Sequence, residues 1–472
     1  MPFLFELSTP TTINFEPLLT DPSGSRIGQL AAANATRGAM RTTIKECKQN
    51  SGDRDWFKAV RTIEDYLPHL LGLMDAVEKD ILLMPSDIVF SWRPTLSSRR
   101  VRSSPRISSP SFYYELAFVL LNLGFALSNT SNSLVNSMGS YEHGTEAERR
   151  AGDGKLNSAA ETLCRASGIF EFLSKEIIPK WEKYHPSGIV DLRSARPPEL
   201  SREAANGLAQ QTLADAERLA IRRLLSRSAM DRHSNPGAGL PKSHPSPALL
   251  AKLELNVHHL YSSAKDAFKL ASGVGEISSS LRSYVSEGRQ LALGRGYKWL
   301  ALEAGEQASQ NGEAISWLNL SREALKAVCS GPVLAVRNGS LKNDWARKKA
   351  KIEQELEEIQ KFLKAYEQLN RTVCVFTFIR FFASRSTCHL SDAEAWNDVL
   401  KSKVTFEPIP AGATLLARVP GGRAALSMKP YTMPPPLQKD FGAYTPSGVT
   451  EWADSDDEDA PSSTREPDQA YC

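Results

Sequence analysis

The segment KLNSAAETLCRASGIFEFLSKEIIPKW, residues 155–181, gathers apolar and small side chains on one side of a helix. They recur in steps of four and three residues, the spacing at which side chains share a helical face. Pro179 and Pro186 limit the end of this pattern. The segment therefore predicts an amphipathic helix whose buried face is formed by Ala159, Leu163, Ala166, Phe170, Leu173, Ile177 and Trp181.

The same periodicity recurs in the second half of the chain. It predicts helices over residues 250–271, 315–328 and 352–366, the last within a charged sequence that favours an antiparallel partner helix or a short coiled coil. The most apolar stretch, residues 112–129, contains Glu115 and Asn122, so it predicts a buried helix rather than a membrane span. The predicted fold class is all-α, with a single elongated domain.

Composition narrows the possible functions. Hydrophobic residues make up 41% and charged residues 24% of the 472 positions, which is typical of a globular protein. The net charge of +3 is too small to favour nucleic-acid binding. Because the six cysteines are scattered and the common nucleotide, hydrolase and zinc motifs are absent, the sequence predicts no enzyme, cofactor or metal site.

Segments rich in Ser, Pro, Gly and Arg separate the helices. Residues 91–111 and 226–247 are predicted to be long loops. The first contains a basic cluster, which we interpret as a solvated loop, with an anionic lipid or an acidic partner as the alternative: Arg93, Arg99, Arg100, Arg102 and Arg106. Pro-rich and then acidic sequence near the carboxyl end predicts a disordered tail over residues 431–472, which leaves residues 1–430 as the helical domain.

The run RTVCVFTFIRFFASRSTCHLSDAEAW, residues 371–396, does not match its surroundings. A charged helix is predicted to end near Asn370, and an apolar, β-branched and aromatic run follows it. Two interpretations stay open: a genuine insertion that forms a strand or a buried helix, and a translated intron.

Several stretches together resemble the Bro-domain family of curved, all-helical adaptors. The likeness covers roughly residues 1–430 and is diffuse rather than a short motif. It is carried by SWRPTLSS at 91–98, YYELAFVLLNLGFALS at 113–128, the opening segment at 155–181, ALLAKL at 248–253, YSSAKDAF at 261–268 and KWLALEAGEQASQNGEAISWLNLSREAL at 298–325.

The resemblance implies a non-catalytic adaptor in fungal ambient alkaline pH signalling. Such a protein is expected to bind the C-terminal amphipathic helix of an ESCRT-III subunit, and so to promote proteolytic activation of a zinc-finger transcription factor. The expected localisation is cytoplasmic, with peripheral recruitment to endosomal or plasma-membrane signalling sites and contacts to other pH-signalling components. By likeness to the family's apolar groove, the partner-binding residues are expected to be Leu219, Ala220, Ile221, Leu249 and Leu253.

The same leucines have a plainer interpretation. Leu250, Leu253 and Leu260 fall on the core side of the predicted helix over residues 250–271, whereas Leu249 points about 100° away from Leu250. A helical-repeat scaffold of the tetratricopeptide type is the alternative function, since GEAISWLNLSREAL resembles one helix of such a repeat. No repeat with a 34-residue period supports it.

Overall fold

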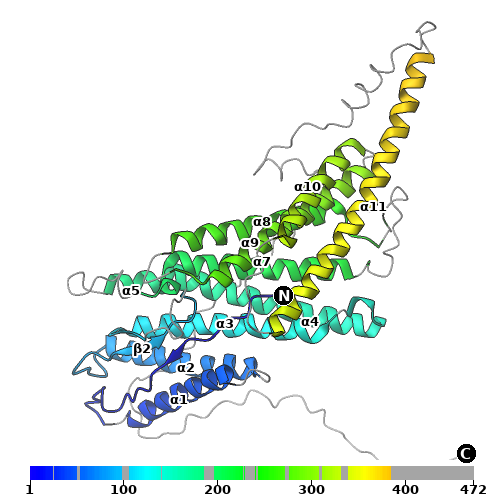
Figure 1. Ribbon diagram of the computed structural model, residues 1–472. Helices are drawn as coiled ribbons and strands as arrows, with labels where there is room; N and C mark the ends of the chain where they lie inside the picture. Colours follow the sequence, from blue (N-terminus) through cyan, green and yellow to red (C-terminus); the bar gives the residue numbers. More distant parts are fainter. Residues whose placement is uncertain are drawn as a thin grey trace, which may run out of the picture.

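A computed structural model shows a stack of helices with one small sheet at an end (Figure 1). Each long helix packs against the next one along the chain, from α1 to α11. The prediction of an all-α, elongated helical domain is confirmed. The structure describes residues 1–383 except for 25, 50–53, 98–105, 140, 185–195, 227, 229–239, 241–242, 272–275, 308–310 and 331–338.

The helices agree with the periodic segments of the sequence. They are α1 (Ile27–Gln49), α2 (Trp56–Glu78), α3 (Phe112–Met138), α4 (Glu146–Phe172), α5 (Ile178–Tyr184), α7 (Arg202–Ser226), α8 (Pro247–Leu270), α9 (Ser279–Leu302), α10 (Asn311–Cys329) and α11 (Gly339–Ala383).

The helix predicted over residues 159–181 begins earlier than expected, and its path continues through Pro179. A capping box explains its start, because Thr145 and Glu148 satisfy each other's backbone N–H groups before α4. A single π-helical turn, Leu173–Ile177, joins α4 to α5, and the Ile178 N–H donates to the Leu173 carbonyl within it. The wider turn accommodates a proline that has no N–H of its own, so the helical path continues.

Residues 91–111 were predicted to be a loop, and this is wrong at both ends. The segment contributes most of β2 (Phe90–Arg93) and all of β3 (Ile107–Ser109), which form an antiparallel sheet with β1 (Thr9–Pro10) in the order β1-β2-β3. Trp92 of β2 is fully buried, stacks on Phe118 of α3, and donates its indole N–H to Glu115 at 2.6 Å. The sheet is therefore fastened to α3 by a buried polar contact.

A second buried carboxylate fastens the chain after β2. Glu199 lies in the short turn Pro198–Leu200 and is fully buried. It accepts hydrogen bonds from the backbone N–H groups of Thr95 and Leu96, at 2.8 and 3.3 Å, and from the Ser97 hydroxyl at 2.7 Å. Burial raises the pKa of this carboxyl, while the three donors oppose the shift.

The amino-terminal segment lies extended along α3 and is bound there by asparagine side chains. Asn129 donates to the Phe5 carbonyl and accepts from the Phe5 N–H, at 2.8 and 2.7 Å. Asn122 makes the same pair of contacts with Ser8, at 3.2 and 2.8 Å. Asn122 thus lies on the helix predicted to be buried, and its amide is satisfied by backbone rather than by solvent.

Two glycines allow helices to approach closely. A Cβ atom on Gly124 of α3 would lie 2.4 Å from the Phe170 ring of α4. A Cβ atom on Gly207 of α7 would lie 2.6 Å from the Phe268 ring of α8. In both places a buried aromatic ring occupies the space above the glycine, so the absence of a side chain sets the distance between the helices.

Helix α11 packs beside α9 and α10. Arg295 and Lys298 of α9 pair with Glu355 and Glu358 of α11, at 2.7 and 2.6 Å, and the constant offset of 60 positions means that the two helices run parallel. Helix α10 runs antiparallel to α9, since Ser321 bonds to the Gly294 carbonyl and Tyr297 contacts Trp317. The predicted antiparallel partner of α11 is therefore α10.

The helix predicted to end near Asn370 instead continues to Ala383. Residues 384–396, the boundary predicted at residue 430 and the predicted tail over 431–472 lie outside the described residues. The choice between a genuine insertion and a translated intron stays open.

Candidate functional site

Helix α7 presents two different faces. One face carries Gln211, Asp215 and Arg218, which point toward α8, α9 and the amino-terminal segment. The opposite face carries Leu213, Glu217, Ala220 and Leu224, spaced by four, three and four residues. Of the predicted partner-binding residues of α7, Ala220 lies on this second face and Leu219 and Ile221 lie on either side of it in the sequence.

The five predicted residues fall into two groups. Leu219, Ile221 and Leu253 are only 5%, 3% and 2% exposed and belong to the hydrophobic core. Ala220 and Leu249 are half-buried, and Leu249 packs against the edge of that core. Only the second pair offers apolar surface to a partner in this conformation, and Leu249 lies off the core side as its position relative to Leu250 predicts.

The pairing of α7 with α8 brings Ala220 and Leu249 to one surface. Asn256 of α8 donates its side-chain N–H to Glu217 of α7 at 2.7 Å. Because the two helices are antiparallel, moving seven residues forward along α7 and seven back along α8 brings Leu224 opposite Leu249. We call this surface the α7–α8 face and define it by Ala220, Leu224, Leu249, Lys252 and Asn256.

Leu224 was missed by the sequence analysis. It is half-buried and packs against the core edge, as Leu249 does. Leu224 follows Ala220 by four residues, so the sequence places both on one side of a helix. The sequence LAIRRLLS does not indicate which neighbouring helix that side faces. Only the antiparallel pairing with α8 identifies it.

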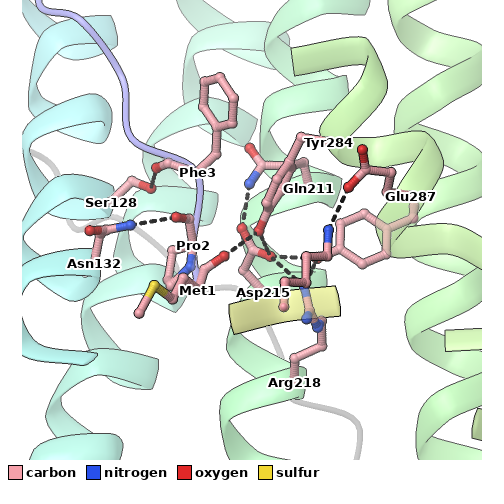
Figure 2. A network of polar contacts seen from close by, with 12 residues as sticks. Met1, Pro2, Phe3, Ser128, Asn132, Gln211, Asp215, Arg218, Tyr284 and Glu287 are labelled. Atoms are coloured by element: carbon pink, nitrogen blue, oxygen red, sulfur yellow. Dashed lines mark hydrogen bonds and ion pairs between the residues drawn. The ribbon is translucent and has the colours of Figure 1, made fainter. Parts of the chain in front are cut away.

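The inner face of α7 is the centre of a polar network (Figure 2). Asp215 is 2% exposed and accepts hydrogen bonds from the hydroxyls of Tyr261 and Tyr284 and from Gln211. The Tyr284 hydroxyl also lies 2.9 Å from the Met1 carbonyl. Burial raises the pKa of both tyrosines, with the Asp215 charge adding to the shift, so both hydroxyls stay protonated as donors.

A buried carboxyl lies next to this network on α8. Glu254 is 3% exposed, and burial raises its pKa to about 7 although Arg295 and Arg218 oppose the shift. Two further charged groups act on it: Glu355 raises the pKa and Lys298 lowers it. The carboxyl of Glu254 therefore lies among charged side chains of α7, α9 and α11.

The described part of the chain also bears on metal binding and on membrane insertion. No three His, Cys, Asp or Glu side chains gather there in a way that could hold a metal ion. No helix in those same residues is both long enough and apolar enough to cross a membrane.

The stacked helices and the small sheet define a predominantly helical domain, and its α7–α8 face carries half-buried apolar side chains. The sequence model of the BRO1-like domain matches residues 33–373, which is most of the chain. The protein therefore belongs to the BRO1-like domain family, and the resemblance predicted from the sequence is confirmed.

Its relatives include fungal proteins of one name. The chain is 28% identical to the pH-response regulator protein palC of Cryptococcus neoformans var. neoformans serotype D, with 100% of this chain and 98% of the relative covered. It is 24% identical to the pH-response regulator protein palC of Emericella nidulans, over 69% of this chain and 68% of that one.

Solved structures show the same fold. The BRO1 domain of ALIX in a complex with CHMP4C matches with a TM-score of 0.50 at 16% identity, covering 76% of this chain and 87% of that one. ALIX in complex with the SIVmac239 PYKEVTEDL Late Domain matches with a TM-score of 0.52 at 16% identity, covering 76% of this chain and 45% of that one.

Proposed function

We propose that the protein is a non-catalytic adaptor in fungal ambient alkaline pH signalling. Its α7–α8 face binds the C-terminal amphipathic helix of an ESCRT-III subunit, and the assembly promotes proteolytic activation of a zinc-finger transcription factor. Family membership and the names of the fungal relatives support the signalling role. The ALIX domain solved with CHMP4C supports the kind of partner.

The observation that carries the proposal is the apolar pair formed by Leu224 and Leu249. Both are half-buried and pack against the edge of the hydrophobic core, and the register set by Glu217 and Asn256 places them on the same side of the two helices. An amphipathic helix binds such a surface by inserting apolar residues at i, i+3, i+4 and i+7. Ala220 lies one turn before Leu224 and has a small side chain, and Leu219, Ile221 and Leu253 lie in the hydrophobic core.

The proposed adaptor acts at a membrane without spanning it. In this proposal it is cytoplasmic and reaches endosomal or plasma-membrane signalling sites through its ESCRT-III partner, with other pH-signalling components as further contacts. The α7–α8 face carries half-buried apolar side chains from two packed helices, the kind of surface that receives an amphipathic helix, which is why we infer binding rather than catalysis.

The test is a titration of the ESCRT-III C-terminal helix, as a labelled peptide, into Leu249→Asp and Leu224→Asp variants. A buried apolar anchor contributes ~1.5–3 kcal/mol, and each ~1.4 kcal/mol is tenfold in Kd. Each variant is therefore expected to weaken binding about tenfold to a hundredfold. Leu270→Asp is the matched control, because Leu270 lies on α8 with 72% of its surface exposed.

Unchanged affinity in both variants, with unchanged melting, would show that the partner binds elsewhere. A pull-down separates the alternative function, a helical-repeat scaffold for another complex, because such a scaffold has no reason to select an ESCRT-III subunit.

A further inference from the structure

Three arginines gather where the sheet meets α1. Arg41 of α1 donates its Nε–H to the Pro10 carbonyl at 3.2 Å, and Arg106 donates from Nη1 to the Thr9 carbonyl at 3.1 Å. Arg93, the last residue of β2, is the strand partner of Thr9. Because Trp92 pairs with Ile107, extending the register by one residue puts Arg93 opposite Arg106. We call these three side chains the arginine cluster.

The positive charge of the arginine cluster is not neutralised within the described part of the chain. None of its members forms an ion pair there, and the buried Nε of Arg93 has no hydrogen-bond acceptor there. The nearby carboxylates are occupied: Glu115 binds Arg37 at 2.8 Å, and Glu6 binds Lys48 at 2.6 Å. Like charges directly opposite each other in neighbouring strands are destabilising, so the arrangement favours an anion.

The surroundings of Arg106 lead to the same conclusion. Its pKa is lowered by burial and then by the charges of Arg93 and Arg41. A guanidinium presents parallel N–H groups that match a carboxylate or a phosphate in a bidentate fashion. An anion with several carboxylate or phosphate groups therefore complements the arginine cluster.

We propose that the arginine cluster binds the acidic segment of this same chain, residues 454–459. Five of those six positions are carboxylates: Asp454, Asp456, Asp457, Glu458 and Asp459. In the sequence, Arg99, Arg100 and Arg102 lie between Arg93 and Arg106.

The covalent connection makes this contact favourable. Seventy residues separate Ala383 from Asp454, and an extended chain spans about 3.3 Å per residue, so reach is not limiting. Tethering of a segment to its site supplies an effective concentration that a free peptide lacks. Since the contact is largely electrostatic, added salt weakens it.

The test measures how fast phenylglyoxal modifies each arginine in the full-length protein, read by mass spectrometry. The comparison variant neutralises the acidic segment with D454N, D456N, D457N, E458Q and D459N. Arg41 and Arg106 are expected to react severalfold faster in that variant than in the wild type at low salt, and 0.5 M salt is expected to remove the difference. Arg322 of α10 is the internal reference and should react equally in both.

Two matched variants complete the design. Glu353→Gln with Glu357→Gln removes exposed carboxylates of α11 and should leave the reactivity of Arg41 and Arg106 unchanged. Arg41→Gln with Arg106→Gln should make cleavage by an acid-specific protease within residues 451–459 severalfold faster. A melting curve of each variant checks that the domain stays folded.

Equal arginine reactivity in the wild type and the tail-neutralised variant would overturn the proposal. Protection of Arg41 and Arg106 that disappears on dilution would also overturn it, because the acidic segment would then belong to a second copy of the protein. If phosphatidylserine vesicles protect both proteins alike, and the two do not differ without vesicles, the cluster serves a membrane and the proposal is wrong.

Discussion

The backbone N–H of Thr95 donates a 2.8 Å hydrogen bond to Oε1 of Glu199, a residue 104 positions further along the chain. The contact joins the segment after β2 to the turn before α7. Glu199 is fully buried and accepts three hydrogen bonds from residues 95–97. It therefore links the segment after the sheet to the helical stack.

Replacing Glu199 is expected to destabilise the protein. Glu199→Ala leaves two backbone N–H groups and one hydroxyl without an acceptor, which costs at least ~2 kcal/mol. Glu199→Gln keeps one acceptor oxygen and should lose less. Urea unfolding followed by circular dichroism measures both, with Glu161→Gln on the exposed surface of α4 as the control expected to change nothing.

Gly124→Ala is expected to destabilise the α3–α4 contact. Alanine is favoured over glycine in a helix by about 1 kcal/mol, but the new Cβ would lie 2.4 Å from the Phe170 ring. Overpacking of this kind costs ~1–3 kcal/mol and outweighs the gain. Gly154→Ala in α4 is the matched control, because no atom lies within 4 Å of its added Cβ and it should stabilise the protein. Equal effects of both changes would contradict the close packing.

The stability of the domain is expected to fall between about pH 4.5 and pH 7 through Glu254. Its pKa is about 7 in the folded protein, above the ordinary value of 4.5, so the folded state holds a proton that the unfolded state releases in this interval. Stability therefore decreases as pH rises through it, by a quantity on the order of 3 kcal/mol for this group.

The difference between the wild type and Glu254→Gln isolates this contribution. The free energy of unfolding of the variant should be less dependent on pH between 5 and 7. If the two proteins show the same slope, the carboxyl titrates in its ordinary range.

Ile221→Asp and Leu249→Asp are expected to differ sharply in stability. Ile221 is 3% exposed, so an aspartate there loses apolar burial and buries a charge, which together cost ~4 kcal/mol or more. Leu249 is half-buried at the edge of the core, and its aspartate can reach water, so the loss should be about 1 kcal/mol. Denaturant midpoints decide the matter, and equal losses would place Leu249 in the core.

The sequence predicts the helices of this protein better than its sheet. A helix such as α8 repeats its apolar side chains over 24 residues, so the periodic signal accumulates within one segment. Strand β2 has four residues and β3 has three, too few for an alternating pattern to emerge, and their pairing joins distant parts of the chain. The continuation of α11 past Asn370 was missed because β-branched and aromatic residues favour strands only as a tendency.

The candidate site, like the fold, is predicted from the sequence only in part. The resemblance points to α7 and α8, which pack against each other, but three of its five residues are buried in the core. Exposure depends on which neighbour covers a side chain, and this information is distributed over α4, α7 and α8. Leu224 becomes visible only when Glu217 and Asn256 fix the pairing of two helices.

Asn122 and Asn129 of α3 bind the peptide groups of the amino-terminal segment, not its side chains. Each side-chain amide donates one N–H to a backbone carbonyl and accepts one backbone N–H, as the peptide groups of a neighbouring strand would do. Mutational drift at the exposed Leu4 is therefore inexpensive for the fold. The peptide groups of Phe5 and Ser8 are thus held by a helix more than a hundred positions further along the chain, and changing either amide to an acid would remove its donor to a backbone carbonyl.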